Sequence, residues 1–167
     1  MTSWASSSNC LRFRTANEGD VEKLTDLINA AFVVERPIFG GDRLNADEVR
    51  QRMETGAFIL AEDEGGLAGC FYIELHGERG YLGLLSVDPP RQKSGIGSTL
   101  VAEAENRCRA AGCKHLDLRV VNVREGLPGF YQRLGYGETG TSPLPADAKP
   151  RVPCHFIHMS KSLHPCR

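Results

Sequence analysis

The sequence contains no Gly-x-x-x-x-Gly-Lys-Ser/Thr run, no Cys-x-x-Cys pair and no long apolar stretch. The first absence argues against a Walker A loop, which needs that run to hold nucleotide phosphates. The second leaves six cysteines scattered without zinc or redox spacing. The third argues against a membrane span, and an N-terminus without basic residues or an apolar core does not resemble a signal peptide. We therefore expect no metal, no membrane partner and a cytoplasmic location.

An excess of one charge is also lacking. Twenty lysines and arginines face 21 acidic residues, which gives a formal net charge of −1. A nucleic-acid-binding protein usually shows a basic surplus, so we expect no nucleic-acid partner. The chain of 167 residues suits one globular domain with its own core. We predict a flexible N-terminal tail over 1–10 and a single domain over 11–163.

The most informative segment joins an apolar strand to a helix through a glycine-rich loop. The strand is predicted over 81–87, an Asp-Pro-Pro run at 88–90 ends it, and residues 92–97 open the helix. Glycines let a ligand approach the backbone, and a helix N-terminus presents free N–H groups and positive potential. The segment therefore predicts a pyrophosphate-binding loop. The alternative is a glycine turn that merely starts a helix.

Two nucleotide-binding patterns remain to be compared with this loop. Gly95 and Gly97 fill two positions of the dinucleotide pattern Gly-x-Gly-x-x-Gly, but Leu100 occupies the third. The loop also follows several strands, which argues against a nicotinamide-dependent enzyme. Gln92 completes the other pattern, because Gln92-x-x-Gly95-x-Gly97 matches the Arg/Gln-x-x-Gly-x-Gly/Ala loop of the GCN5-related N-acetyltransferases (GNAT).

Two later motifs extend the resemblance to this family. Asn122 follows the apolar run 115–121, and Phe130-Tyr131 stands before Gly135-Tyr136. Family members often place an Asn after the corresponding strand and a Phe-Tyr-x-x-x-Gly-Phe/Tyr block at the end of the next helix. From about residue 11 to 163 the chain therefore resembles a GNAT acetyltransferase.

Hydrophobic periodicity predicts a mixed order of strands and helices. Strands are expected over 11–14, 57–61, 67–75, 81–87, 115–121, 136–139 and 155–160. Helices are expected over about 20–32, 46–54, 95–111 and 125–134, with loops at 35–43 and 141–153. Hairpin turns at 64–66 and 77–80 argue against a purely parallel sheet. The fold class is therefore α+β (mixed α/β), and the resemblance implies a mixed, mostly antiparallel central sheet flanked by helices.

The resemblance also implies where acetyl-CoA, the co-substrate, binds. In the family the strands matching 81–87 and 115–121 splay apart and receive the pantetheine arm. Backbone N–H groups of the glycine loop would bind the pyrophosphate, with side-chain donors from Gln92 and Lys93. Val87 N–H would polarise the thioester carbonyl, and Asn122 would bond the pantetheine or orient the strand end. The implied cofactor-binding residues are Leu85, Ser86, Val87, Gln92, Lys93, Ser94, Gly95, Ile96, Gly97, Ser98 and Asn122.

Catalysis requires an acid for the departing thiolate and a base for the attacking ammonium. The resemblance makes Tyr131 the general acid, since its phenol is well matched to a thiolate. Many family members carry an acidic base on the strand matching 81–87, and this chain has none between 83 and 86. Glu74 on the preceding strand and Glu35 in the first loop are the candidate bases. His155 is more simply a partly buried residue.

The implied reaction is direct attack of a primary amine on acetyl-CoA in a ternary complex, with a small molecule or amino-acid derivative as acceptor. The alternatives are a non-catalytic acyl-CoA-binding module and an acetyltransferase of protein N-termini or lysines. Family members are often dimers, so a homodimer is allowed. The acceptor's charge stays open: Glu35 and Asp42 suit a cationic amine, whereas Arg36, Arg43 and Arg151 suit a carboxylate. Three roles are open for Arg124: it caps the next helix, binds substrate or faces solvent.

Overall fold

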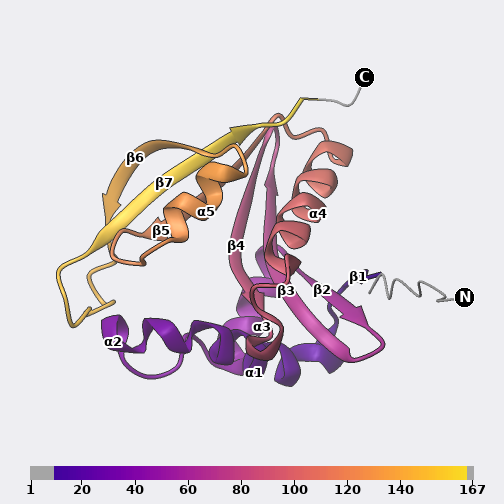
Figure 1. Cartoon of the computed structure of the whole chain (residues 1–167), viewed down its shortest axis with the longest axis horizontal. Helices are drawn as coiled ribbons and strands as arrows, with labels where there is room; N and C mark the ends of the chain where they lie inside the picture. Colours follow the sequence, from indigo (N-terminus) through magenta and orange to yellow (C-terminus); the bar gives the residue numbers. More distant parts are fainter. Residues whose placement is uncertain (1–9, 165–167) are drawn as a thin grey trace, which may run out of the picture.

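The computed structural model describes residues 10–164, which form a seven-stranded sheet in the order β1-β2-β3-β4-β5-β7-β6 (Figure 1). All neighbouring strands are antiparallel except β4 and β5, which are parallel. The strands are β1 (Arg12–Thr15), β2 (Ala57–Asp63), β3 (Gly66–His76), β4 (Arg79–Val87), β5 (His115–Val121), β6 (Gly137–Pro143) and β7 (His155–Ser162). The predicted mixed, mostly antiparallel sheet is confirmed. Apart from Cys10, the predicted tail lies outside the described residues.

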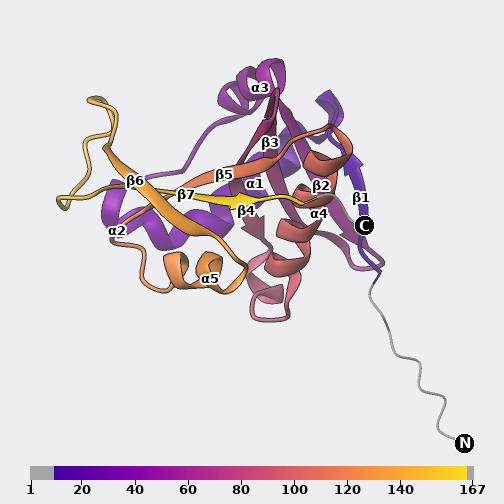
Figure 2. The same ribbon diagram turned by 90° about the horizontal axis from the view of Figure 1, so that it is seen from above.

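Helices cover both faces of the sheet (Figure 2). They are α1 (Val21–Ala31), α2 (Arg36–Phe39), α3 (Ala46–Thr55), α4 (Ile96–Ala110) and α5 (Leu127–Arg133). In β2, Phe58 and Leu60 pack toward α1 and α3, whereas Ile59 and Ala61 pack toward α4. Because both faces are buried, the central strands read as continuous apolar runs. Within 10–164, no helix combines the length and apolar character that a membrane crossing needs.

Two predicted loops are shorter than expected. The segment 35–43 contains α2, because Pro37 suits the first turn of a helix, and Gly40 ends that helix with φ at +71°. The segment 141–153 begins with three residues that extend β6 and pair with β7. Pro143 is tolerated there because β6 is the edge strand, where one N–H group is not needed for pairing. The connection between β6 and β7 therefore starts at Leu144.

The parallel neighbours β4 and β5 pair only at one end. Their register runs from Arg79 opposite His115 to Tyr81 opposite Asp117, and it stops there. Beyond this point the two strands diverge, and β5 turns away with β7 and β6 (Figure 1). The sheet is therefore open along the rest of β4. This is the splay that the family resemblance implied.

A β-bulge shapes the open part of β4. The register with β3 shifts at this point, and Leu84 has a left-handed φ of 50°. Before the bulge Leu82 packs into the core beside α4; after it Leu85 does so, while Leu84 faces the core beside α1. The Ser86 hydroxyl donates to the Leu84 carbonyl at 2.9 Å and supports this conformation. Such a bulge bends a strand and re-aims its side chains, here beside the opening.

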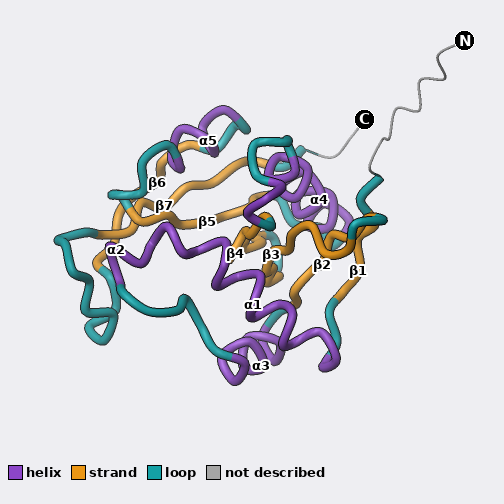
Figure 3. Tube along the Cα trace, turned by 60° about the horizontal axis from the view of Figure 1, so that its bottom comes forward, coloured by secondary structure: helices purple, strands orange, loops and turns teal. Residues whose placement is uncertain are grey.

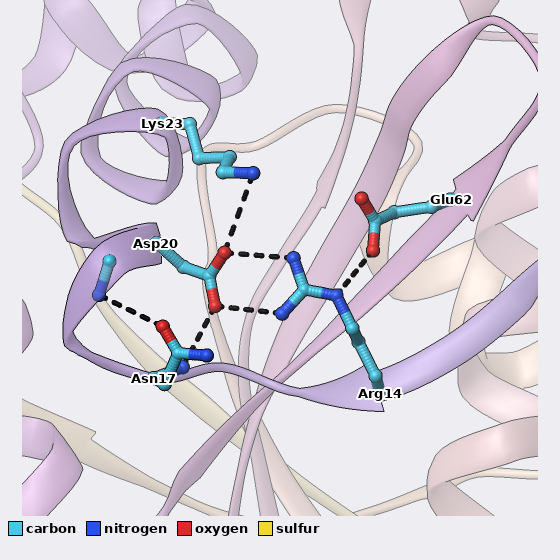
Figure 4. A network of polar contacts seen from close by, with 6 residues as sticks. Arg14, Asn17, Asp20, Lys23 and Glu62 are labelled. Atoms are coloured by element: carbon cyan, nitrogen blue, oxygen red, sulfur yellow. Dashed lines mark hydrogen bonds and ion pairs between the residues drawn. The ribbon is translucent and has the colours of Figure 1, made fainter.

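A polar network fixes the start of the chain to the sheet (Figure 4). Arg14 of β1 donates two hydrogen bonds of 2.8 Å to Asp20 and one of 2.5 Å to Glu62 of β2. Asp20 also accepts from the backbone N–H of Asn17. Asp20 is 3% exposed, and the Arg14 guanidinium holds the pKa of this carboxyl far below its ordinary value. The network ties β1 and β2 to the beginning of α1.

Candidate functional site

A cavity of about 610 Å³ opens where β4 and β5 diverge. Residues 82–85 of β4 form one wall, and residues 118–121 of β5 form the other. The segment around α2 and the β6–β7 loop close it from a third side. The Arg151 N–H donates to the Ile38 carbonyl at 2.6 Å, so that loop is tied to α2 (Figure 3). The bulged part of β4, which pairs with β3 but not with β5, therefore faces a partly open cavity.

The start of α4 stands at the end of β4 and is built to leave its N–H groups open. Gly95 precedes the helix with φ at +85°, and no side chain caps the first turn. The Gln92 amide instead donates to the Val87 carbonyl, and the Ser94 hydroxyl donates to a backbone carbonyl. Ser98 is exposed in the first turn. Uncapped N–H groups and the helix dipole together favour an anion at this position.

The α4 start is packed closely against α5. A side chain on Gly97 would place its Cβ 3.4 Å from Phe130 Cζ and 3.9 Å from Val87 Cγ2. Phe130 in turn contacts Tyr131, with ring centroids 5.0 Å apart in an edge-to-face arrangement. The two distances from the Cβ position are ordinary van der Waals distances, and they show that the helix start, the end of β4 and α5 lie side by side. The predicted phosphate loop and the predicted acid belong to one packed unit.

Tyr131 lines the cavity from α5. It is 5% exposed, packs edge to face against Tyr136, and has no hydrogen bond to its hydroxyl within residues 10–164. Burial raises the pKa of Tyr131 above its ordinary value, so the phenol keeps its proton. Tyr136 differs, because its hydroxyl donates to Glu105 at 2.9 Å in the core. Of the two tyrosines, Tyr131 is thus the one whose hydroxyl is available in the cavity.

Glu35 and Arg124 reach each other across the cavity. Arg124 follows β5, and its Nη1 donates to Glu35 Oε1 at 2.9 Å. Glu35 is 7% exposed, and both residues line the cavity. The second carboxylate oxygen of Glu35 has no hydrogen-bond donor among the described residues. A buried carboxylate with a free oxygen in a cavity can receive an ammonium or take its proton.

The other predicted base, Glu74, lies outside the cavity lining. Both of its carboxylate oxygens are occupied, one by the Tyr72 hydroxyl at 2.6 Å and one by His76 at 2.8 Å. Desolvation opposes ionisation, yet these hydrogen bonds keep the pKa of Glu74 below its ordinary value. The structure therefore does not bring Glu74 together with Tyr131 and Glu35.

Asn122 joins the ends of β5 and β7. Its N–H donates to the His155 carbonyl at 2.9 Å, and its Oδ1 accepts from the His155 N–H at 2.8 Å. This geometry corresponds to the second of the two expected roles, orientation of the strand end. Neither residue is part of the cavity lining.

The sequence reasoning missed several residues of the cavity. Tyr81 and Arg52 line it, although neither carries a motif. The bulge could have been predicted, because the adjacent apolar residues Leu84 and Leu85 interrupt the alternation of side chains that a regular strand shows. Within residues 10–164, no group of three or more His, Cys, Asp or Glu side chains is arranged to hold a metal ion.

The chain has the fold of known N-acetyltransferases. Ard1 from Thermoplasma volcanium matches with a TM-score of 0.74 and 16% identity, over 93% of this chain and 99% of that one. Ribosomal-protein-alanine N-acetyltransferase from Brucella melitensis matches with a TM-score of 0.72 and 22% identity, over 92% and 100% of the two chains. At these identities the likeness concerns the fold alone.

The chain belongs to the Acetyltransferase (GNAT) family, whose sequence model matches residues 21–136. Mycothiol acetyltransferase of Propionibacterium freudenreichii subsp. shermanii is 29% identical over 150 residues, which cover 84% of this chain and 47% of that protein. The chain thus spans about half the length of that curated relative. The family resemblance drawn from the glycine loop, Asn122 and Tyr131 is confirmed.

Proposed function

We propose that the chain is an acetyl-CoA-dependent N-acetyltransferase that acts on the primary amine of a small molecule or amino-acid derivative. The observation that carries the proposal is the pairing of two features. The uncapped start of α4 offers an anion site at the end of β4, and Tyr131 and Glu35 line one cavity beside that strand. Family membership supports acetyl-CoA as the donor.

The proposed cofactor site uses mainly backbone groups. The N–H groups at the start of α4, from Gly95 to Ser98, would bind the pyrophosphate, because no side chain occupies them. Backbone groups of residues 85–87 would pair with the pantetheine as an added strand, since β5 has left that edge of β4. The Gln92 amide already donates to the Val87 carbonyl, so Lys93 would supply the further side-chain donor.

The proposed reaction forms an amide and breaks a thioester. An ammonium acceptor first gives a proton to the free oxygen of Glu35, and the neutral amine attacks the acetyl carbonyl. The thioester C–S bond then breaks, the Tyr131 hydroxyl protonates the departing thiolate, and the new amide nitrogen gives its remaining extra proton back to the Tyr131 phenolate. Tyr131 suits this role because burial keeps its phenol protonated. Glu74 remains the alternative base, acting through water, although its oxygens are already bonded.

The acceptor separates the proposal from its alternatives. One relative is named for mycothiol and another for a ribosomal protein, so membership in the family does not decide which acceptor is used. A non-catalytic acyl-CoA-binding module would use the same α4 start, but would not need an available phenol in the cavity.

Release of CoA thiol from acetyl-CoA tests the proposal directly. We expect thiol release that depends on an added primary amine, and a loss of about 100-fold in kcat for Tyr131→Phe, because a general acid contributes on this scale. Tyr136→Phe is the matched control, since that hydroxyl bonds Glu105 in the core. Acetyl-CoA binding without thiol release on a broad panel of amines, including an N-terminal peptide, would favour the non-catalytic module.

A further inference from the structure

The cavity contains three arginines without acidic partners. Arg43, Arg52 and Arg119 line it, and their guanidinium groups form no hydrogen bond or ion pair with another residue in the part of the chain that the structure describes. Each guanidinium instead lies over an aromatic ring, at 5.7, 5.5 and 4.4 Å from the ring centroid respectively. Cation–π contacts leave the N–H donors of a guanidinium free.

Four carboxylates line the cavity together with four arginines, but they are not paired with these three. These carboxylates are Glu35, Asp42, Glu48 and Asp147. Glu35 is bonded by Arg124, and Asp42 is bonded by Arg36 at 3.0 Å. Glu48 accepts from the backbone N–H of Asn45 at 3.2 Å, and Asp147 has no partner within residues 10–164. The formal charges therefore balance, but none of these carboxylates forms an ion pair with Arg43, Arg52 or Arg119, whose N–H donors stay unused among the described residues.

Arg43 lies among the charged groups of the cavity. Glu35 and Glu48 attract it and Arg52 repels it, so these groups lie within electrostatic range of Arg43. Desolvation lowers the pKa of Arg43 from its ordinary value, which means that its charge is incompletely compensated. Neither Arg36 nor Arg151 lines the cavity. Of the three arginines that the sequence offered for a carboxylate, only Arg43 is in position.

We infer that the acceptor is a small amine that also carries an oxyanion, a carboxylate or a phosphate. Its oxyanion binds Arg43, with Arg52 adding positive charge, and its amine meets the free oxygen of Glu35. A guanidinium presents paired N–H donors that match the oxygens of such a group. This inference rests on the proposed function, since it places the substrate in the same cavity.

Product binding tests the inference without relying on turnover. N-acetylleucine and N-acetylleucinamide differ only in the carboxylate, and each is titrated calorimetrically into the CoA-saturated protein. We expect the carboxylate form to bind at least tenfold more tightly, because charge-assisted hydrogen bonds are the strong ones. Arg43→Gln should abolish this difference, and Arg43→Lys should retain part of it. Equal binding of the two compounds to the wild type, or a difference that persists in Arg43→Gln, would overturn the inference.

Matched controls separate this test from the proposed function. Arg12→Gln removes the same charge from an exposed position outside the cavity, and should keep the wild-type preference. Acetyl-CoA titrations check that each variant is folded and binds the donor. Thiol release with leucine against leucinamide, and with phosphoethanolamine against ethanolamine, then distinguishes carboxylate from phosphate. If no amine is acetylated while acetyl-CoA binds, the proposed function fails, whereas the product titration still decides the anion site.

Discussion

The starts of α3 and α4 differ in how their backbone N–H groups are satisfied. At α3, the Asn45 side chain accepts from the Glu48 N–H at 2.9 Å, and the Glu48 side chain accepts from the Asn45 N–H. This capping box closes the helix with its own residues. At α4, Gly95 precedes the helix and no side chain caps it. One helix start is complete within the protein, whereas the other has donors left for a ligand.

The same contrast separates two buried carboxylates that each face an arginine. Asp20 uses both oxygens, which receive Arg14, Lys23 and the Asn17 N–H (Figure 4). Glu35 uses one oxygen, toward Arg124, and its second oxygen has no donor within residues 10–164. Burial alone therefore does not distinguish a structural group from a functional one. Unused hydrogen-bonding capacity beside a cavity does.

The largest effect is expected from Glu35→Gln, which keeps the contact with Arg124 but removes the proton acceptor. We predict a loss of about 100-fold in kcat/KM for an amine substrate, equivalent to about 2.7 kcal/mol, and a separate loss of about 2 kcal/mol in unfolding free energy because Arg124 loses its charged partner. Steady-state thiol release measures it, and Glu64→Gln in the exposed β2–β3 turn is the control. A comparable loss in Glu74→Gln, with Glu35→Gln active, would assign the base to Glu74 instead.

A smaller effect, on stability and not on activity, is expected from Asp20→Asn. This change removes one of the two carboxylates that pair with the Arg14 guanidinium, and we predict a loss of about 2 kcal/mol in unfolding free energy. The value lies below that of a fully buried pair because the Arg14 side chain is 39% exposed. Urea denaturation measures it. Activity per folded molecule should stay at the wild-type level, and a selective loss of activity would contradict the structural role of Asp20.

The stability contribution of Asp20 should depend on pH in a defined direction. Because Arg14 lowers the folded-state pKa of Asp20, the contribution is fully present above the unfolded pKa of about 3.9 and is lost as pH falls below it. The difference in unfolding free energy between wild type and Asp20→Asn should therefore shrink from pH 6 to pH 3. A difference that grows toward acid pH would contradict this assignment.

The smallest effect is expected from Asn45→Ala at the start of α3. Loss of a helix cap costs about 1 kcal/mol of unfolding free energy, and acetyl-CoA binding should not change. Thermal and urea denaturation, together with an acetyl-CoA titration, measure both quantities. Weaker acetyl-CoA binding in this variant would show that the two helix starts are not independent.

Much of the fold could be predicted from the sequence because it rests on local patterns. The central strands, the long helix after Gly95 and the hairpin turns carry strong periodicity and turn signals. The short helix α2 was missed, because four residues around Pro37 give no periodic signal. The extension of β6 to Pro143 was also missed, since an exposed edge strand lacks apolar alternation.

The candidate site was less accessible to sequence reasoning because it is assembled from distant segments. Tyr131 and the glycine loop have motifs, and Glu35 was a candidate by its loop position. Its partner Arg124 is 89 positions away, and only the tertiary structure brings the two together. The choice of Arg43 over Arg36 and Arg151 likewise depends on which side chain lines the cavity.

Calorimetric titration of acetyl-CoA into the wild type and into Ser98→Glu tests the central contrast most directly. A glutamate in the first turn of α4 favours the helix itself, but it places a negative charge where the pyrophosphate would bind. We predict micromolar binding to the wild type, a loss of at least tenfold in Ser98→Glu, and near wild-type binding in Ser98→Ala. No acetyl-CoA binding by the folded wild type, or equal binding by Ser98→Glu, would contradict the assignment of the open α4 start as the phosphate site.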